Sequence, residues 1–358
     1  MKEIQEILAA YDSVGENGPA ATLATVVRTT GATYRGPGAR MLLIEGGQHA
    51  GLLCGGMVDK ELHQRARNVQ STGAAMTFSF PECSRRAQHP ATEDDPSDGL
   101  IEVLLEPLSG RADEVPIALL REVTEARELL VVATIFSAKG MDAPEAGTRL
   151  VLDAKGQVRS PLATSPLENA IIADARQVLK TGRCLNKTYA FGDEVEVFFE
   201  RLSPPLRIAI FGGGLDSCPL VKLSTEVGWR SFVTDQNPAY ANKGRFHLAE
   251  EVYVARPEEI RDKVPLDEYT VAVVLTHDYQ QDLALIEELM PSPVPYIGLI
   301  GPKTRAQHLR KDLLARGKLS SVAQLERLFA PAGIDIGAET PHEIALAVLA
   351  EIRAHLAH

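Results

Sequence analysis

The segment LRIAIFGGGLDS, residues 206–217, constrains the fold of this chain more than any other. Its first part is a short apolar run with β-branched residues, which is typical of a buried parallel strand. Gly212, Gly213 and Gly214 follow, and apolar residues at helical spacing come next. A strand, a glycine turn and a helix in this order predict the phosphate-binding corner of a doubly wound sheet, where backbone N–H groups at the helix N-terminus face the ligand.

The match to a dinucleotide-binding fingerprint is incomplete. The outer two glycines fit the G-x-G spacing, but Ser217 stands at the third glycine position and Asp216 would repel a phosphate. Asp235 ends the next predicted strand about twenty residues on, where a carboxylate can hold a ribose hydroxyl. We therefore predict nucleotide-type binding at the glycine turn and Asp235. The alternative is a turn that needs glycine only for packing.

Composition narrows the class of protein. A chain of 358 residues suggests two or three domains, and 45% hydrophobic with 24% charged residues is typical of a globular protein. The net charge of −11 makes nucleic acid and anionic membranes unfavourable partners, and no apolar run is long enough to span a membrane. The first residues predict an amphipathic helix rather than a signal peptide, hence a cytoplasmic protein. Cys54, Cys83, Cys184 and Cys218 are scattered, which argues against a zinc framework.

The N-terminal half is a tandem repeat with an offset of 109 positions, in which Arg40 aligns with Arg149. After an insertion of fifteen residues in the first copy the offset falls to 94, and Glu106 aligns with Glu200. We expect an N-terminal domain at 1–203, made of repeats 1–109 and 110–203, and a second domain at 206–358. Whether the two copies share one sheet or pack as a pseudo-dimer is left open.

Each copy is expected to contain a helix, a strand, a glycine-punctuated loop, a second strand, a long helix and a closing strand. In the first copy these elements lie at 3–11, 21–27, 40–44, 58–71 and 99–105, and in the second at 115–129, 130–136, 149–152, 167–180 and 194–199.

The glycine-punctuated loop of the first copy contains Arg35 and Arg40. Arginine is suited to bidentate capture of phosphate or carboxylate. The second copy keeps Arg149 at the position of Arg40 but has Pro144 at that of Arg35. We place both first-copy arginines in the predicted cofactor site, Arg35 as the stronger ligand candidate and Arg40 as one also suited to an ion pair that closes the loop.

A second loop of the first copy contains Cys54, Gly55 and Gly56. A glycine pair that opens a helix exposes backbone N–H groups and predicts an anion site. The second copy has no such pair, so the first copy is expected to have kept a ligand site. Cys54 is either a thiolate stabilised by the helix N-terminus or a small core residue.

Strands and helices alternate in the C-terminal half, which predicts a Rossmann-like doubly wound parallel sheet. The expected strands lie at 207–211, 230–234, 251–254, 270–275 and 295–299. His277 follows the fourth strand and is expected to orient a ligand by hydrogen bonding, with general-base catalysis as the alternative. Lys303 and Arg305 follow the fifth and are expected to contact phosphate or carboxylate. Thr340–Glu343 predicts a capping box at the start of the last helix.

Together these segments resemble the XdhC/CoxI family, the accessory factors of xanthine dehydrogenase and related molybdenum hydroxylases. The similarity covers the N-terminal loops at 31–41 and 51–59. In the C-terminal half it covers GGGLDS at 212–217, VVLTHD at 273–278, YIGLIGPKTRAQHL at 296–309 and GIDIGAETPHEIALAVLAEI at 333–352. The resemblance implies binding of the molybdenum cofactor, help with its sulfuration by a cysteine desulfurase, delivery to an apo-hydroxylase, and a homodimer.

The chain departs from the family's usual pattern at three places. Met57 stands where a cysteine is common directly after the glycine pair, and Asp59 stands where a glutamate is common. The segment 96–99 replaces a common Gly-Cys-Gly-Gly, and Leu215 replaces a histidine. These changes place the sulfur chemistry of the family in doubt for this chain, unless Cys54 or Cys218 substitutes for a missing cysteine.

Three functions therefore remain open. The first is a cofactor-binding chaperone, which need not be an enzyme. The second is a NAD-dependent oxidoreductase that uses Asp235 on the ribose and His277 as acid and base. The third is a divergent partner protein that carries no cofactor.

Overall fold

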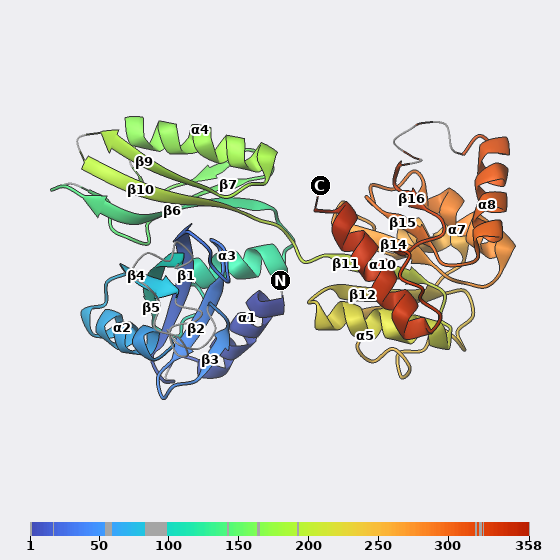
Figure 1. Ribbon diagram of the computed structural model, residues 1–358, viewed down its shortest axis with the longest axis horizontal. Coiled ribbons are helices and arrows are strands. Elements are labelled where there is room, and N and C mark those ends of the chain that lie inside the picture. Colours follow the sequence, from blue (N-terminus) through green and yellow to red (C-terminus); the bar gives the residue numbers. More distant parts are fainter. Residues whose placement is uncertain are drawn as a thin grey trace, which may run out of the picture. The chain divides into compact units, whose positions relative to one another are not determined.

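A computed structural model describes residues 2–357 except 17, 54–58, 83–98, 142, 163–164, 192, 319–320, 322–323 and 325. Its contacts divide the chain into two compact units, one at Glu3–Pro204 and one at Pro205–His358 with the first two residues. The described part of the first unit holds two antiparallel sheets, and that of the second holds one parallel sheet (Figure 1). The predicted α/β fold class with a Rossmann-like C-terminal sheet is confirmed.

Each N-terminal repeat forms a sheet of its own, so the repeats do not share one. The first sheet has the order β3 (His49–Gly51), β2 (Arg40–Ile44), β1 (Ala21–Thr30), β5 (Gly99–Leu108) and β4 (Met76–Glu82). The second has the order β8 (Val158–Arg159), β7 (Arg149–Asp153), β6 (Leu130–Lys139), β10 (Asp193–Leu202) and β9 (Leu185–Phe191). The two orders are the same when the repeats are aligned.

In the described part of this unit, four helices cover the two sheets, namely α1 (Lys2–Val14), α2 (Asp59–Thr72), α3 (Val115–Thr124) and α4 (Pro166–Thr181). Helix α2 packs on the first sheet and α4 on the second, each through apolar residues at helical spacing. Helices α1 and α3 share one core with strands of both sheets. Val27, Leu104, Phe136 and Phe198 form a smaller core of their own.

The C-terminal sheet has the order β13 (Glu251–Val254), β12 (Arg230–Asp235), β11 (Arg207–Phe211), β14 (Thr270–Val274), β15 (Ile297–Leu299) and β16 (Leu328–Phe329). Every pair in it is parallel. In sequence order this is 3-2-1-4-5-6, the order of dinucleotide-binding sheets. Five of these strands were predicted, and β16 was not.

Alternate residues of the central strands face opposite layers, as the period of a strand requires. Ile208 and Ile210 pack with α5 (Cys218–Glu226) and α10 (Pro341–His355), whereas Ala209 and Phe211 pack with α7 (Tyr279–Leu289) and α8 (Lys303–Ala315) (Figure 1). The short helix α6 (Ile260–Lys263) joins the second layer. Because the strand order reverses between β11 and β14, a crevice is expected at their carboxyl ends.

Candidate functional site

The glycine turn after β11 is packed against the chain itself. Gly212 and Gly213 are both buried. Gly212 has a φ of 128°, and a Cβ there would lie 2.5 Å from the carbonyl oxygen of Leu275. A Cβ on Gly213 would lie 2.7 Å from the carbonyl oxygen of Tyr240. These contacts give both glycines a packing role, one of the two interpretations that the sequence allowed, and a phosphate-binding role stays a prediction.

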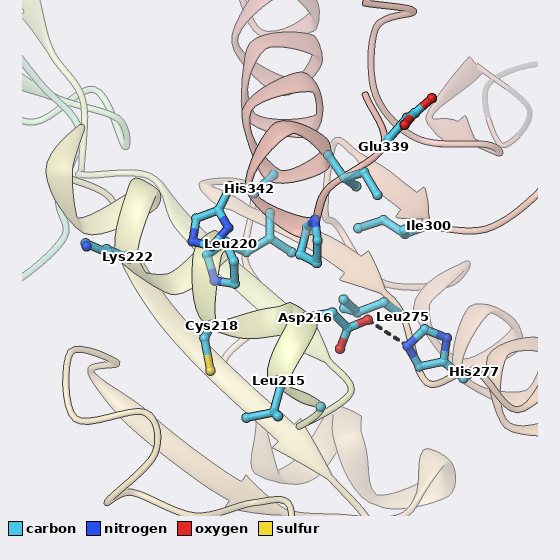
Figure 2. Close-up of a pocket in the computed structure, with 15 residues that line it drawn as sticks. Leu215, Asp216, Cys218, Leu220, Lys222, Leu275, His277, Ile300, Glu339 and His342 are labelled. Atoms are coloured by element: carbon cyan, nitrogen blue, oxygen red, sulfur yellow. Dashed lines mark hydrogen bonds and ion pairs between the residues drawn. The ribbon is translucent and has the colours of Figure 1, made fainter. Parts of the chain in front are cut away.

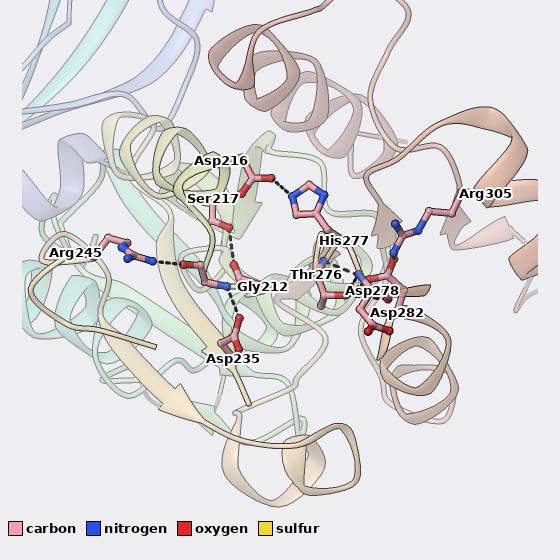
Figure 3. A network of polar contacts seen from close by, with 11 residues as sticks. Gly212, Asp216, Ser217, Asp235, Arg245, Thr276, His277, Asp278, Asp282 and Arg305 are labelled. Carbon is pink, nitrogen blue, oxygen red and sulfur yellow. Dashed lines mark hydrogen bonds and ion pairs between the residues drawn. The ribbon is translucent and has the colours of Figure 1, made fainter. Parts of the chain in front are cut away.

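Asp216 and His277 face each other across the crevice (Figure 3). Oδ2 of Asp216 lies 2.6 Å from Nε2 of His277. In the neutral tautomer that carries its proton on Nε2, the imidazole donates to the carboxylate through Nε2–H and keeps Nδ1 as an acceptor. The side chains are 27% and 73% exposed, so a ligand can reach both. The carboxylate also folds back toward Gly214, where a Cβ would collide with Oδ1.

His277 has a left-handed backbone, with a φ of 62°. Residues with a Cβ rarely adopt this conformation, which costs on the order of 1 kcal/mol and is found more often at functional sites than elsewhere. Here it turns the chain directly after β14 and lets the imidazole reach Asp216, which lies on the neighbouring turn.

The Asp216–His277 pair lines a pocket of about 860 Å³ (Figure 2). Its volume is in the range of small-molecule sites. The walls are mainly apolar, and come from the turn and helix after β11, from the end of β14 and from the start of α10. The lining residues are Gly214, Leu215, Asp216, Cys218, Pro219, Leu220, Lys222, Leu275, His277, Ile300, Glu339, Pro341, His342, Ile344 and Ala345.

Asp235 lies beside the glycine turn, as predicted from its spacing, but its carboxylate already has partners. The backbone N–H groups of Gly213 and Asn237 donate to it at 2.8 Å each. Arg245 adds a further contact, because its Nη1 donates to the carbonyl oxygen of Gly213 at 2.7 Å. The loop that carries Arg245 thus packs against the glycine turn beside Asp235.

Arg305 pairs with Asp282, a carboxylate that is fully buried. Asp282 also accepts hydrogen bonds from the backbone N–H of Thr276, at 3.2 Å, and from its hydroxyl, at 2.5 Å. Arg305 therefore steadies the loop that carries His277, and its role toward a ligand stays a prediction. Lys303 is exposed at the start of α8 and does not line the pocket.

The predicted N-terminal site residues lie in the other unit. The Arg35 guanidinium forms a bidentate pair with Glu3, with distances of 2.7 and 2.5 Å. Arg40 forms a buried ion pair with Glu200 of the other repeat, so its pair joins the repeats instead of closing its own loop. Cys54, Gly55 and Gly56 lie outside the described residues.

Sequence reasoning did not assign Lys222, Glu339 or His342 to a site, and it named Cys218 only as a substitute for a missing family cysteine. Cys218 and Lys222 lie four positions apart on α5, and this spacing on the helix after the glycine turn would have placed them on one face. His342 lies within the capping box, which forms as predicted, because Thr340 accepts from the N–H of Glu343. No sequence pattern indicated that the imidazole of His342, in the first turn of α10, would line a pocket.

Groups of three or more side chains that could hold a metal ion are absent from the residues that the structure describes. In the same part of the chain, we find no helix with the length and apolar character needed to cross a membrane.

Comparison with known proteins identifies the family. A model described as the XdhC and CoxI family matches residues 15–81 and 123–190, and one described as the XdhC Rossmann domain matches 208–352. A relative from Bacillus subtilis (strain 168), described as a probable xanthine dehydrogenase subunit, is 30% identical over 344 residues, which are 95% of this chain and 94% of that protein. The chain belongs to the XdhC and CoxI family.

Two further relatives cover most of this XdhC-family chain. "Molybdenum cofactor insertion chaperone PaoD" of Escherichia coli (strain K12) is 23% identical over 337 residues, 94% of this chain and 83% of that protein. A crystal structure described as a xanthine dehydrogenase from Bacillus halodurans has a TM-score of 0.75 at 25% identity, and the similarity covers 100% of this chain and 96% of that one. The two segments that match the XdhC and CoxI model fall one in each N-terminal repeat.

One departure from the usual XdhC pattern can be placed in the structure. Leu215, which stands where a histidine is common, lines the pocket and is 75% exposed. Met57 and residues 96–98 lie outside the described residues. The pocket of this chain therefore has an apolar side chain at the position where the family resemblance implies a histidine.

Proposed function

We propose that this chain binds the molybdenum cofactor and delivers it to a molybdenum hydroxylase of the xanthine dehydrogenase type. The observation that carries the proposal is the pocket of about 860 Å³ at the point where the strand order reverses. Open parallel sheets bind their ligands at this point. The relationship to the insertion chaperone PaoD supports cofactor carriage as the use of the pocket.

The residues of the pocket fit the organic part of this cofactor, which is a pterin with N–H donors and a phosphate. Apolar walls suit the ring, Asp216 and His277 supply acceptors, and Lys222 and His342 supply donors or positive charge. The metal centre supplies redox chemistry in the client enzyme. This chain's residues would bind the pterin, orient it and exclude water from part of its surface.

We further propose that the chain acts as a homodimer in the cytoplasm and supports sulfuration of the cofactor together with a cysteine desulfurase. Cys218 supports this finer proposal, because it is a thiol in the pocket wall. Replacing Cys218 with serine would then lower the fraction of cofactor recovered in its sulfurated form without lowering the total amount bound.

Anaerobic native mass spectrometry of the protein purified from a molybdenum-replete host tests the main proposal. A bound species of pterin-cofactor mass is expected, and it should be lost in Asp216→Ala and retained in Glu268→Gln, which changes an exposed charge outside the pocket. Protein that arrives empty and takes up no cofactor on anaerobic loading would contradict the proposal.

A second candidate function is a NAD-dependent oxidoreductase. The 3-2-1-4-5-6 strand order and the position of Asp235 beside the glycine turn favour it. The covered Gly213 and the engaged carboxylate of Asp235 weigh against it. Calorimetric titration with NAD(H) and NADP(H) decides, because saturable binding of a dinucleotide would favour this candidate over the first.

A further inference from the structure

We infer that Asp216, held in place by His277, recognises the N–H-rich edge of the pterin ring, and that the phosphate of the ligand lies on the Lys222 and His342 side of the pocket instead of at the glycine turn. This inference rests on the proposed function and assigns the orientation of the ligand within the same pocket.

A phosphate at the glycine turn is unfavourable for two reasons. Gly212 and Gly213 are buried beneath backbone carbonyl groups, so the close approach that glycine normally permits is already taken by the chain. The remaining glycine, Gly214, lies under the Asp216 carboxylate. Two negative charges a few ångströms apart in a mainly apolar pocket repel each other strongly, because the local dielectric constant is low.

The same carboxylate is well suited to N–H donors. Asp216 is partly exposed in the pocket, and only one of its oxygens is bound by His277. An ionised carboxylate has about four acceptor sites and can accept two parallel hydrogen bonds. The 2-amino-4-oxo edge of a pterin offers two adjacent N–H groups. Leu220, Leu275 and Ile344 supply apolar surface for the rings that this edge belongs to.

The basic side chains of the pocket lie away from Asp216. Figure 2 shows Lys222 on α5 and His342 at the start of α10, whereas Asp216, on the helical turn before α5, points toward His277 after β14. A ligand whose ring edge meets Asp216 therefore directs its other end toward Lys222 and His342. This polarity fits a heterocycle that carries a phosphate on its opposite side.

Calorimetric titration of the full chain with two probes tests the ring edge. The probes are 6-hydroxymethylpterin and 6-hydroxymethyllumazine, which differ in the exchange of the 2-amino group for an oxygen. Wild type should prefer the pterin by about tenfold or more, as expected for a hydrogen bond to a charged group. Asp216→Asn should reduce this preference to about twofold or less, while the exposed, charge-matched Asp262→Asn should keep it. Thermal melts show whether each variant is folded.

The phosphate monoester of 6-hydroxymethylpterin tests the other end. Wild type should bind it more tightly than the parent pterin by about tenfold, and Lys222→Gln combined with His342→Gln should remove that gain. The exposed Lys311→Gln serves as the matched control and should retain it. If Lys303→Gln removes the gain and the double variant does not, the assigned orientation is wrong.

The outcomes separate the inference from the proposed function. Pterin binding that is insensitive to Asp216→Asn overturns the inference and leaves the cofactor carrier intact. Tighter binding of guanosine 5′-monophosphate, which has the same edge on a purine, overturns the assignment to a pterin. Absence of binding by either pterin probe, with loss of cofactor in native mass spectrometry, overturns both.

Discussion

Arg149 of the second repeat donates hydrogen bonds of 2.7 and 2.6 Å to the two carboxylate oxygens of Glu106 in the first repeat. Their counterparts, Arg40 and Glu200, form the reciprocal ion pair. Each arginine also donates to the carbonyl oxygen of the glycine two residues before it. The repeats thus contact each other as the two halves of a symmetric dimer do, with one surface used twice.

Polar contacts of the neighbouring strands follow the same symmetry. The Thr77 hydroxyl donates to the carbonyl oxygen of Phe136 at 2.5 Å, and the Asn186 amide donates to that of Val27 at 2.8 Å. Thr77 and Asn186 occupy equivalent positions in the repeats, as do Val27 and Phe136. These reciprocal contacts hold the two repeats together in the N-terminal unit.

Breaking the reciprocal ion pair should therefore destabilise this unit. The side chains of Arg149 and Glu106 are 9% and 7% exposed. Glu106→Gln leaves a buried guanidinium without its counter-charge, which should lower the free energy of unfolding by about 3–5 kcal/mol. Urea unfolding followed by circular dichroism measures this change, and the fluorescence of Trp229 reports separately on the C-terminal unit.

A matched control for this prediction is Lys139→Ala. Lys139 pairs with Glu194 on the surface, with side chains 75% and 53% exposed, so its removal should cost less than about 1 kcal/mol. Equal effects of the two substitutions would show that the buried pair does not hold the repeats together.

Gly212→Ala should destabilise the C-terminal unit through a backbone collision. Its φ of 128° and the 2.5 Å approach of a Cβ to the Leu275 carbonyl oxygen predict a loss of at least about 2 kcal/mol. Gly317→Ala is the control, because it also has a positive φ but meets nothing within 4 Å, and should cost about 1 kcal/mol. Denaturant midpoints read by Trp229 compare the two, and indistinguishable midpoints would refute the packing role of the turn.

Because His277 has a left-handed backbone conformation, we expect an asparagine at this position to be more stable than a valine. Asn tolerates a φ near 62°, so His277→Asn should unfold within about 0.5 kcal/mol of wild type. His277→Val places a β-branched residue in that conformation and should cost about 1–2 kcal/mol. Thermal melts rank the variants, and a valine variant as stable as the asparagine variant would contradict the strained backbone.

Alkylation of the Cys218 thiol should be slower in the folded protein than in the unfolded chain, because the surroundings of Cys218 raise the pKa of its thiol. Burial raises the pKa of the Cys218 thiol, and the Asp216 carboxylate raises it further, while Arg245 acts in the opposite direction. The thiolate is therefore scarcer at about pH 8 than in the unfolded chain, and alkylation by iodoacetamide should be slower. The alkylation rate should keep rising as the pH increases above about 8.5, the ordinary pKa of a thiol. Over the same pH range, the free energy of unfolding should fall, because the folded state favours the protonated thiol.

Peptide mapping by mass spectrometry isolates Cys218 from the other three cysteines in this experiment. Asp216→Asn removes one cause of the raised pKa and should speed alkylation at about pH 8. The opposite change, or a folded rate equal to that of the urea-unfolded chain, would show that the thiol is not buried as described.

The sequence by itself predicted the features that depend on local patterns. The predicted strand at 207–211 matches β11. A strand in the centre of a parallel sheet is buried on both faces, so its sequence is a continuous apolar run that can be identified without knowledge of its neighbours. The capping box at Thr340 forms as predicted from four consecutive residues. The family resemblance, carried by motifs along most of the chain, is confirmed by the comparisons.

Only the tertiary structure decided how distant residues are paired. Asp216 had no explanation in the sequence, because its partner His277 is 61 positions away and reaches it only through the adjacent ends of β11 and β14. Arg40 was interpreted as a ligand or as one half of an ion pair that closes its own loop, but its ion-pair partner lies 160 positions away, in the other repeat. The two-residue strand β16 was missed for the same reason, since its pairing depends on β15 and not on its own sequence. Local propensity selects helices, strands and turns, whereas the position of charges in a pocket or an interface is set by non-local packing of the whole fold.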